Sequence, residues 1–323
     1  MLKVFVTRPI PEAGIKMLRD KGYGVVINEK ARDRAASEKE LINGVKGADA
    51  LLSVLTDKIT AKVMDAGLPT LKIIANYAVG FDNIDLEAAK SRNIMVTNTP
   101  GVLTDTVAEH TFTLMLAIAH RIAEADRFSK AGKYKAWGPE LMLGTDLSGK
   151  TLGVVGLGRI GSRVAHHAVK GFDMKVVYTD VKQNLEFEQK FGAVFASTID
   201  ELLPKCDFVS IHVPLLPSTH HLINEARLKL MKPTAYLINT SRGPVIDEHA
   251  LSDALKKYQI AGAAIDVFEF EPEIVKDLKK MDNIILTPHI ASATRETRDK
   301  MSELAAQNII MALSGQLPPN LVR

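Results

Sequence analysis

The chain has 323 residues, of which 46% are hydrophobic and 24% are charged, so it can bury large cores and suggests about two domains. The net charge of +3 is small for this length and gives no basic stripe of the kind that nucleic-acid binding requires. The single cysteine, Cys206, excludes an intramolecular disulfide and a cysteine-based zinc site, and it fits a reducing compartment.

Short apolar runs alternate with amphipathic stretches in the first part of the chain, the pattern of a parallel sheet with helices on its faces. A helix is expected over residues 12–22. The runs predict strands at residues 3–7, 24–28, 50–55, 72–80 and 94–98. We therefore expect one small doubly wound domain here.

The segment 99–128 predicts a long helix that connects two domains. Pro100 and Gly101 end the preceding strand, and Thr106 with Glu109 fits a capping box. We therefore expect the helix to begin near Thr106 and to run through several turns.

No membrane association is expected. The longest apolar run near a helix, residues 114–119, is too short to span a bilayer, and the N-terminal stretch MLKVFVTRPI lacks the pattern of a signal peptide. These features predict a cytoplasmic protein.

A second series of buried strands begins after residue 150. The strands are expected at residues 151–158, 174–180, 193–196, 207–214, 235–241, 262–268 and 283–289. Seven buried strands with intervening helices predict a Rossmann-type sheet. The tail over residues 293–310 is predicted to be helical.

The first strand of this series ends in GLGRIG, the spacing of a dinucleotide-binding turn. Gly156 permits the tight turn, Gly158 lets the backbone approach a pyrophosphate, and Gly161 lets the helix pack closely on the strand. The N-terminus of the following helix then offers unpaired N–H groups to the anion.

Asp180 ends the next strand, 19 residues after Gly161. A carboxylate at this place accepts hydrogen bonds from both ribose hydroxyls of NAD and repels the 2′-phosphate of NADP. This predicts NAD as the cofactor, although the nearby Lys182 leaves some use of NADP open.

Three charged residues lie at or just beyond the carboxyl ends of the last three predicted strands: Arg242, Glu271 and His289. Ligands of open α/β sheets bind at the carboxyl ends of the strands, so we expect these side chains to converge beside the dinucleotide. An arginine fork suits a carboxylate and its neighbouring carbonyl oxygen. A histidine can protonate a developing alkoxide, and a carboxylate beside it orients the ring and favours its charged form. The set predicts hydride transfer to a carbonyl acid.

Five segments together resemble the signatures of the D-isomer-specific 2-hydroxyacid dehydrogenases: VTNTPGVLTDTVAEHT, GKTLGVVGLGRIG, INTSRGPVID, AAIDVFEFEP and LTPHIAS. The resemblance extends over almost the whole chain. It implies a flavodoxin-like substrate domain, residues 1–100 plus 291–323, interrupted by a Rossmann NAD-binding domain, residues 101–290, with the active site in a cleft between the domains.

The resemblance also assigns roles to residues. It implies Arg242, Glu271 and His289 as the catalytic trio. It implies that the N–H groups of Val79 and Gly80 hold the substrate carboxylate and that Leu55 or Val54 lines the pocket. Residues implied to line the cofactor are Thr104, Gly156, Leu157, Gly158, Arg159, Ile160, Gly161, Asp180, Val213, Pro214, Thr219, Thr240, Ser241, Arg242, Asp266 and His289. In PHIAS, Ala291 stands where many relatives have glycine.

The segment YKAWGPELMLGTDLSGK is similar to the glyoxylate and hydroxypyruvate reductases, in which its tryptophan reaches the partner subunit's active site. The resemblance implies a homodimer that reduces a small 2-keto acid to a 2-hydroxy acid with NADH. Trp137 serves either that substrate site or the dimer core. The alternatives are a D-3-phosphoglycerate or D-lactate-type dehydrogenase and, in another class, an NAD-sensing corepressor-like binding protein.

Two pairs of neighbouring histidines, His166–His167 and His220–His221, raise the question of a metal site. Adjacent side chains point to different sides of a helix or strand, so neither pair is expected to bind one ion, and no metal is predicted.

Overall fold

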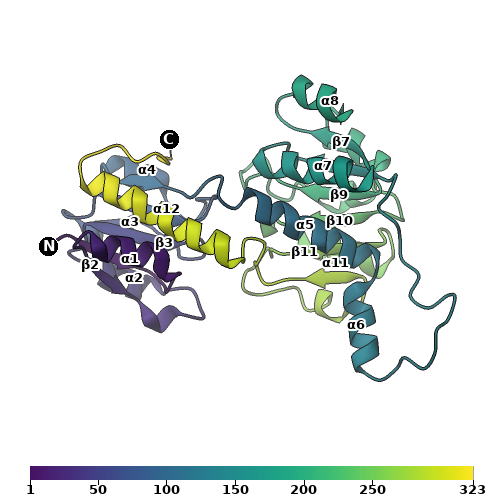
Figure 1. Cartoon of the computed structure of the whole chain (residues 1–323), viewed down its shortest axis with the longest axis horizontal. Coiled ribbons are helices and arrows are strands. Elements are labelled where there is room, and N and C mark those ends of the chain that lie inside the picture. Colours follow the sequence, from purple (N-terminus) through teal and green to yellow (C-terminus); the bar gives the residue numbers. More distant parts are fainter. Residues whose placement is uncertain (323) are drawn as a thin grey trace. The chain divides into compact units, whose positions relative to one another are not determined.

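The computed structural model describes residues 1–322, which form two compact units. The first unit comprises Met1–Leu103 and the chain from Ala293 onward, and the second comprises Thr104–Ser292. Figure 1 colours the chain along its sequence, from purple at the N-terminus to yellow at the C-terminus.

The first unit is built on a five-stranded parallel sheet in the order β2-β1-β3-β4-β5, the order of flavodoxin-like folds. The central strands β3 and β4 are almost wholly buried, as expected of strands covered by helices on both faces. The strands are β1 Lys3–Val6, β2 Gly24–Ile27, β3 Ala50–Val54, β4 Ile73–Tyr77 and β5 Met95–Thr97. The helices are α1 Glu12–Asp20, the 3₁₀ turn η1 Glu29–Ala31, α2 Glu38–Val45, α3 Ala61–Gly67, α4 Leu86–Ser91 and α12 Arg295–Leu313.

The C-terminal helix α12 returns to the first unit, where it packs beside α1 (Figure 1). A Cβ atom at Gly14 would overlap the backbone of Ser302, so only glycine permits this close approach. Ser302 Oγ accepts a hydrogen bond from Gly14 N at 2.9 Å and donates one to Pro11 O at 2.7 Å. Two ends of the chain are thereby joined in one core.

The second unit contains a seven-stranded parallel sheet in the order β12-β11-β10-β9-β6-β7-β8. Counted from β6, this is the Rossmann order with a seventh strand, and the strand order reverses between β6 and β9. The strands are β6 Thr151–Val155, β7 Lys175–Thr179, β8 Val194–Phe195, β9 Phe208–Ile211, β10 Tyr236–Asn239, β11 Gly262–Ile265 and β12 Ile284–Leu286. The helices are α5 Thr104–Ala119, α6 Ile122–Lys130, α7 Arg159–Phe172, α8 Leu185–Phe191, α9 Ile199–Leu202, α10 Glu225–Leu228 and α11 Glu248–Lys256, with 3₁₀ turns η2 Leu203–Lys205, η3 Gly243–Val245 and η4 Leu278–Lys280. The predicted α/β class, with two doubly wound parallel sheets, is confirmed.

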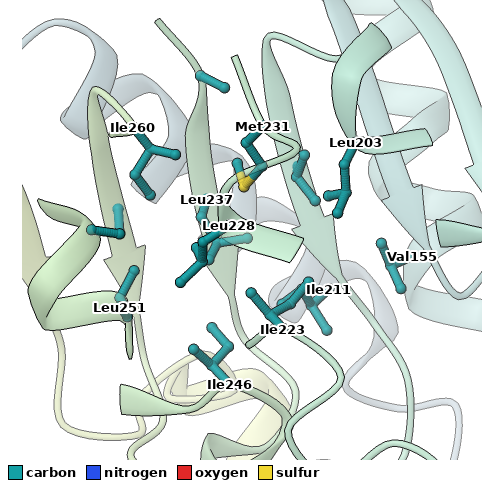
Figure 2. Packing of buried hydrophobic residues seen from close by; sticks show 14 of the residues in the cluster. Val155, Leu203, Ile211, Ile223, Leu228, Met231, Leu237, Ile246, Leu251 and Ile260 are labelled. Carbon is teal, nitrogen blue, oxygen red and sulfur yellow. The ribbon is translucent and has the colours of Figure 1, made fainter. Parts of the chain in front are cut away.

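Alternate residues of these strands serve the two faces of the sheet. On one face Val155, Ile211 and Leu237 pack with Leu228 and Leu251 of α10 and α11 (Figure 2). On the other face, α5 and α7 cover the intervening residues of the same strands. Burying a side chain of this kind contributes about 1.5–3 kcal/mol relative to leaving it exposed. The two covered faces hold the sheet rigid and so fix the positions of its strand ends.

The predicted long helix differs from the observed one at both ends. Helix α5 begins at Thr104, so Thr106 lies inside its first turn and the predicted capping box is wrong. Arg121, in the left-handed region with φ 55°, separates α5 from α6, so the segment forms two helices. None of the helices within residues 1–322 combines the length and apolar character needed to cross a membrane.

Candidate active site

One edge of the second unit's sheet collects most of the predicted site residues. Because its strands are parallel, their carboxyl ends meet at the same edge. Gly156 follows β6, Asp180 follows β7, Arg242 follows β10, Asp266 follows β11 and His289 follows β12. The edge therefore carries a glycine turn, two carboxylates, a guanidinium and an imidazole.

The glycine turn has the geometry of an anion-binding loop. Gly156 adopts φ +94°, and a Cβ there would lie 2.8 Å from His212 O. A Cβ at Gly161 would overlap Gly156 O, so helix α7 packs tightly on the turn. Around Gly158, by contrast, an added Cβ would meet no atom within 4 Å. The open space lies at the N-terminus of α7, where backbone N–H groups favour a phosphate, so these residues fit a dinucleotide.

Asp180 is tied to this turn. Its Oδ2 accepts a hydrogen bond from Leu157 N at 2.6 Å, and its Oδ1 accepts one from Val181 N at 2.6 Å. The two bonds hold the carboxylate at the end of β7, next to the loop, while Lys182 is exposed. The sequence predicts an acid at the end of this strand, and in the structure two backbone N–H groups orient its carboxylate.

A threonine side chain within the turn after β9 stabilises that turn. Val213 and Pro214 follow the strand, and Thr219 Oγ1 donates to Pro214 O at 2.6 Å. The same hydroxyl accepts a hydrogen bond from Leu216 N at 2.8 Å. Val213 lies beside the glycine turn, because a Cβ at Gly156 would lie 3.0 Å from its Cγ1.

His289 and Glu271 form a direct pair. Nδ1 of the imidazole lies 3.2 Å from Glu271 Oε2, and the two side chains are 23% and 24% exposed. Glu271 Oε1 accepts a hydrogen bond from Phe268 N at 3.0 Å, which orients the carboxylate. Because Nδ1 faces the carboxylate, Nε2 is the ring nitrogen left for a substrate.

Asp266 anchors the loop that carries His289. Its side chain is fully buried, and its Oδ1 accepts hydrogen bonds from Thr287 Oγ1 at 2.6 Å and Ile290 N at 2.9 Å. Its Oδ2 accepts one from Ala291 N at 2.7 Å, and its backbone carbonyl accepts one from His289 N at 2.8 Å. The aspartate therefore accepts hydrogen bonds from residues on both sides of His289. His289 itself adopts φ +55°, in the left-handed region.

The charge of Asp266 is maintained in spite of its burial. Burial raises the pKa of this carboxyl group. Hydrogen bonds from His110, Thr287 and the amides of Ile290 and Ala291 together lower the pKa by more than burial raises it, so it lies below the ordinary value. His110 Nε2 lies 3.5 Å from Asp266 Oδ1. The sequence analysis missed His110 and Thr287, although both fall in segments that carry the family resemblance.

The loop after β10 fixes the backbone at Arg242. Asn239 Oδ1 accepts hydrogen bonds from Ser241 N at 3.0 Å and Ser241 Oγ at 2.8 Å, while Asn239 Nδ2 donates to Arg242 O at 3.0 Å. A Cβ at Gly243 would overlap the backbone carbonyl of Phe268. The loop of Arg242 thus packs on the segment that orients Glu271, which brings two members of the predicted trio onto adjoining segments.

Thr240 and Thr104 were also predicted to line the cofactor. Thr240 Oγ1 lies 2.8 Å from Thr111 Oγ1 of α5, so it is tied to the helix below the strand end. Thr104 is the first residue of α5 and is half-buried. Arg159 and Ile160 begin α7, directly after the open space at Gly158.

In the first unit, the predicted substrate residues share one sheet edge. Leu55 follows β3, and Val79 and Gly80 follow β4, its neighbour in the sheet. The carbonyl of Val79 accepts a hydrogen bond from Asn98 Nδ2 at 2.7 Å, and that of Gly80 accepts one from Asn76 Nδ2 at 2.8 Å. These bonds fix the direction of the turn after β4.

Trp137 lies in the connection between α6 and β6 and is 79% exposed. Leu143 in the same connection is 65% exposed. Within the second unit, the tryptophan therefore contributes nothing to a buried core.

The predicted divergence of neighbouring histidines is wrong for His220 and His221. Their ring centroids lie 4.0 Å apart with an interplanar angle of 31°. The rule applied to helices and strands, whereas His221 lies in a turn with φ +49°. The His166–His167 pair lies on helix α7, with ring centroids 5.6 Å apart.

Comparison with known proteins gives concordant matches. The family described as "D-isomer specific 2-hydroxyacid dehydrogenase, NAD binding domain" matches residues 112–291. The glyoxylate reductase of Thermofilum pendens is 52% identical over 322 residues, covering 99% of this chain and 94% of that protein. The glyoxylate reductase of Thermococcus litoralis is 50% identical, covering 99% and 96%. Among solved structures, the TT0316 protein from Thermus thermophilus superposes with a TM-score of 0.93 at 43% identity, over 100% of both chains.

Proposed function

The chain belongs to the D-isomer-specific 2-hydroxyacid dehydrogenases, an oxidoreductase family, and from this premise we propose that it reduces glyoxylate and hydroxypyruvate with NADH. The observation that carries the proposal is the contact of 3.2 Å between His289 Nδ1 and Glu271 Oε2, at the sheet edge that also holds the glycine turn. The names of the two relatives supply glyoxylate as a substrate, and the resemblance of the segment around Trp137 adds hydroxypyruvate.

His289 is proposed as the proton donor. NADH, held by the glycine turn and Asp180, would supply the hydride for the carbonyl carbon of the substrate. Glu271 accepts a hydrogen bond from Nδ1, so in the protonated ring Nε2 carries the proton that passes to the carbonyl oxygen. The products are the 2-hydroxy acid and NAD⁺, and the imidazole is left neutral.

Arg242 is proposed to bind the substrate. Its guanidinium offers parallel donors that match a carboxylate and the adjacent carbonyl oxygen, and it polarises the carbonyl as negative charge develops. Support comes from the hydrogen bonds through Asn239 and the close packing at Gly243, which hold its backbone. In the first unit, we propose that Val79 and Gly80 bind the substrate carboxylate through their N–H groups, and that Leu55 lines the pocket.

Asp180 is proposed to favour NADH over NADPH. Its carboxylate is held at the end of β7 by Leu157 N and Val181 N, where it can accept bonds from ribose hydroxyls. A 2′-phosphate would meet this negative charge. The other proposed cofactor residues are those of the glycine turn, with Thr104, Val213, Pro214, Thr219, Thr240, Ser241 and Asp266.

Asp266 has a second proposed role, as the residue that positions His289. Three hydrogen bonds to its carboxylate come from the loop that follows β12. We also propose a homodimer, supported by the exposure of Trp137 and Leu143 on one connection. In that homodimer, Trp137 serves either the dimer core or the partner's substrate site.

The test of the proposed function is a substrate panel. Initial rates of NADH and NADPH oxidation are measured with glyoxylate, hydroxypyruvate, pyruvate and 3-phosphohydroxypyruvate. We expect the highest kcat/KM with glyoxylate or hydroxypyruvate and NADH. If pyruvate or 3-phosphohydroxypyruvate is reduced fastest, that acid replaces the proposed substrate. Binding of NADH without turnover of any acid would refute an enzymatic role.

A further inference from the structure

A second cluster of chemically active side chains shares no residue with the His289–Glu271 pair. The turn after β9 ends in His220 and His221, and the left-handed backbone of His221 brings the two rings 4.0 Å apart. His221 N donates to Pro244 O at 2.8 Å, which fixes the backbone of this turn. The two imidazoles are therefore presented on the same side.

Glu269 approaches the histidines from the segment after β11. Its Oε1 lies 2.7 Å from His221 Nε2. Its other oxygen, Oε2, accepts a hydrogen bond from Glu248 N at 3.1 Å, and Glu269 N donates to Glu248 Oε1 at 2.6 Å. Glu248 begins helix α11, so the carboxylate is held from behind by a regular element. The side chain of Glu269 is only 11% exposed, and its position is therefore well defined.

The three residues have the atoms and the spacing of a metal-binding group. One ligand atom from each of His220, His221 and Glu269 lies within 4.8 Å of the other two. Imidazole nitrogens and a carboxylate oxygen bind Zn²⁺ at about 2.0–2.2 Å, which places neighbouring ligand atoms about 3.4 Å apart. Binding an ion therefore requires the His221–Glu269 contact to open from 2.7 Å to about this distance and the exposed ring of His220 to rotate toward it. Water can complete the tetrahedron from the solvent side.

We propose that His220, His221 and Glu269 bind one divalent transition-metal ion, with Zn²⁺ as the reference. Two nitrogen ligands favour Zn²⁺, Co²⁺, Ni²⁺ or Cu²⁺ over Mg²⁺ and Ca²⁺, which prefer oxygen. A bound ion joins the turn after β9 to the segment that leads into Glu271. It stabilises the folded chain by mass action, because an unfolded chain does not hold the three ligands together. None of the three ligands has a role in the proposed reaction.

The alternative is a hydrogen bond between His221 and Glu269 with no ion, in which His220 has no function. The two cases differ in the effect of His220→Gln, a substitution at an exposed position that leaves the His221–Glu269 contact in place. His166→Gln is a matched control, because His166 also has a neighbouring histidine but is not part of this cluster. Glu269→Gln is a second variant that removes a ligand charge and keeps the shape of the side chain.

The experiment uses the full chain without an affinity tag, stripped with a chelator and dialysed. ZnCl₂ is titrated into it by calorimetry, and bound zinc is counted by elemental analysis after gel filtration. We expect one equivalent per chain for the parent and His166→Gln, and affinity weakened by about tenfold or more in His220→Gln and Glu269→Gln. Zinc should raise the Tm of the parent and of His166→Gln but not that of His220→Gln. No stoichiometric uptake by the parent, or uptake that survives His220→Gln unchanged, would overturn the proposal.

Discussion

Replacing Glu271 by glutamine tests the proposed proton donor most directly. In the parent, Glu271 Oε1 accepts from Phe268 N and Oε2 faces His289 Nδ1. A glutamine has only one acceptor oxygen, and Phe268 N requires it, so the NH₂ group turns toward the imidazole. Nδ1 must then accept rather than donate. Because both nitrogens of a protonated ring are donors, the substitution disfavours the protonated ring.

The size of the effect follows from the loss of one charge-assisted hydrogen bond, worth about 1.5–3 kcal/mol. Both side chains are about a quarter exposed, so solvent screening favours the lower end of that range. Since about 1.4 kcal/mol corresponds to a factor of ten in rate, kcat/KM for glyoxylate should fall by about tenfold.

The assay is the initial rate of glyoxylate reduction by NADH from acid to alkaline pH, with NADH affinity followed by fluorescence. Glu273→Gln is the matched control, because Glu273 is exposed and lies two residues further along the chain. It should leave the pH profile and the rate unchanged. A Glu271→Gln kcat/KM equal to that of the parent would refute the electrostatic reasoning.

Three further substitutions test other parts of the site. Arg242→Ala should lower kcat/KM for glyoxylate by a hundredfold or so, the loss of about 3 kcal/mol from a paired guanidinium, with NADH binding retained; near-normal catalytic efficiency would contradict the substrate assignment. Asp180→Ala should weaken NADH binding much more than NADPH binding, since only the 2′-phosphate is relieved of repulsion, and equal losses in a fluorescence titration would argue against it. Because the pKa of Asp266 is lowered in the folded chain, its charge adds stability above about pH 4 that is lost as the pH falls through the folded value. Urea unfolding should therefore show Asp266→Asn to be less stable by about 1.5–3 kcal/mol at pH 7, with a difference that narrows in acid; a constant difference would count against the charged state.

The strand ends were predictable because their signals are local. A parallel strand buried on both faces appears as a short apolar run, and β6, β9 and β11 each end where such a run meets polar residues or glycine. Once the strands are parallel, their carboxyl ends must lie at one edge. The sequence could therefore bring Arg242 and His289 to the same edge without any knowledge of their contacts.

The start and break of helix α5 were not predictable in this way. Thr106 and Glu109 have the spacing of a capping box, but the same spacing also occurs inside a helix, and here the helix has already begun at Thr104. Neither proline nor glycine marks the break at Arg121. The left-handed conformation of Arg121 belongs to a residue type that seldom adopts it, so local composition gives no signal.

Asp266 shows why the sequence could name a site residue and miss part of what it does. A histidine in the left-handed region, as at His289, costs of order 1–3 kcal/mol, and it persists only where the surroundings fix it. Asp266 supplies that constraint by accepting hydrogen bonds from Thr287, Ile290 and Ala291. Because the acceptor is charged, each bond is worth about 1.5–3 kcal/mol. These partners come from a different strand end, so their contact follows from the sheet order and from no local pattern. A buried aspartate at a Rossmann strand end therefore fits two roles, and only the direction of its hydrogen bonds reveals that it also positions the imidazole.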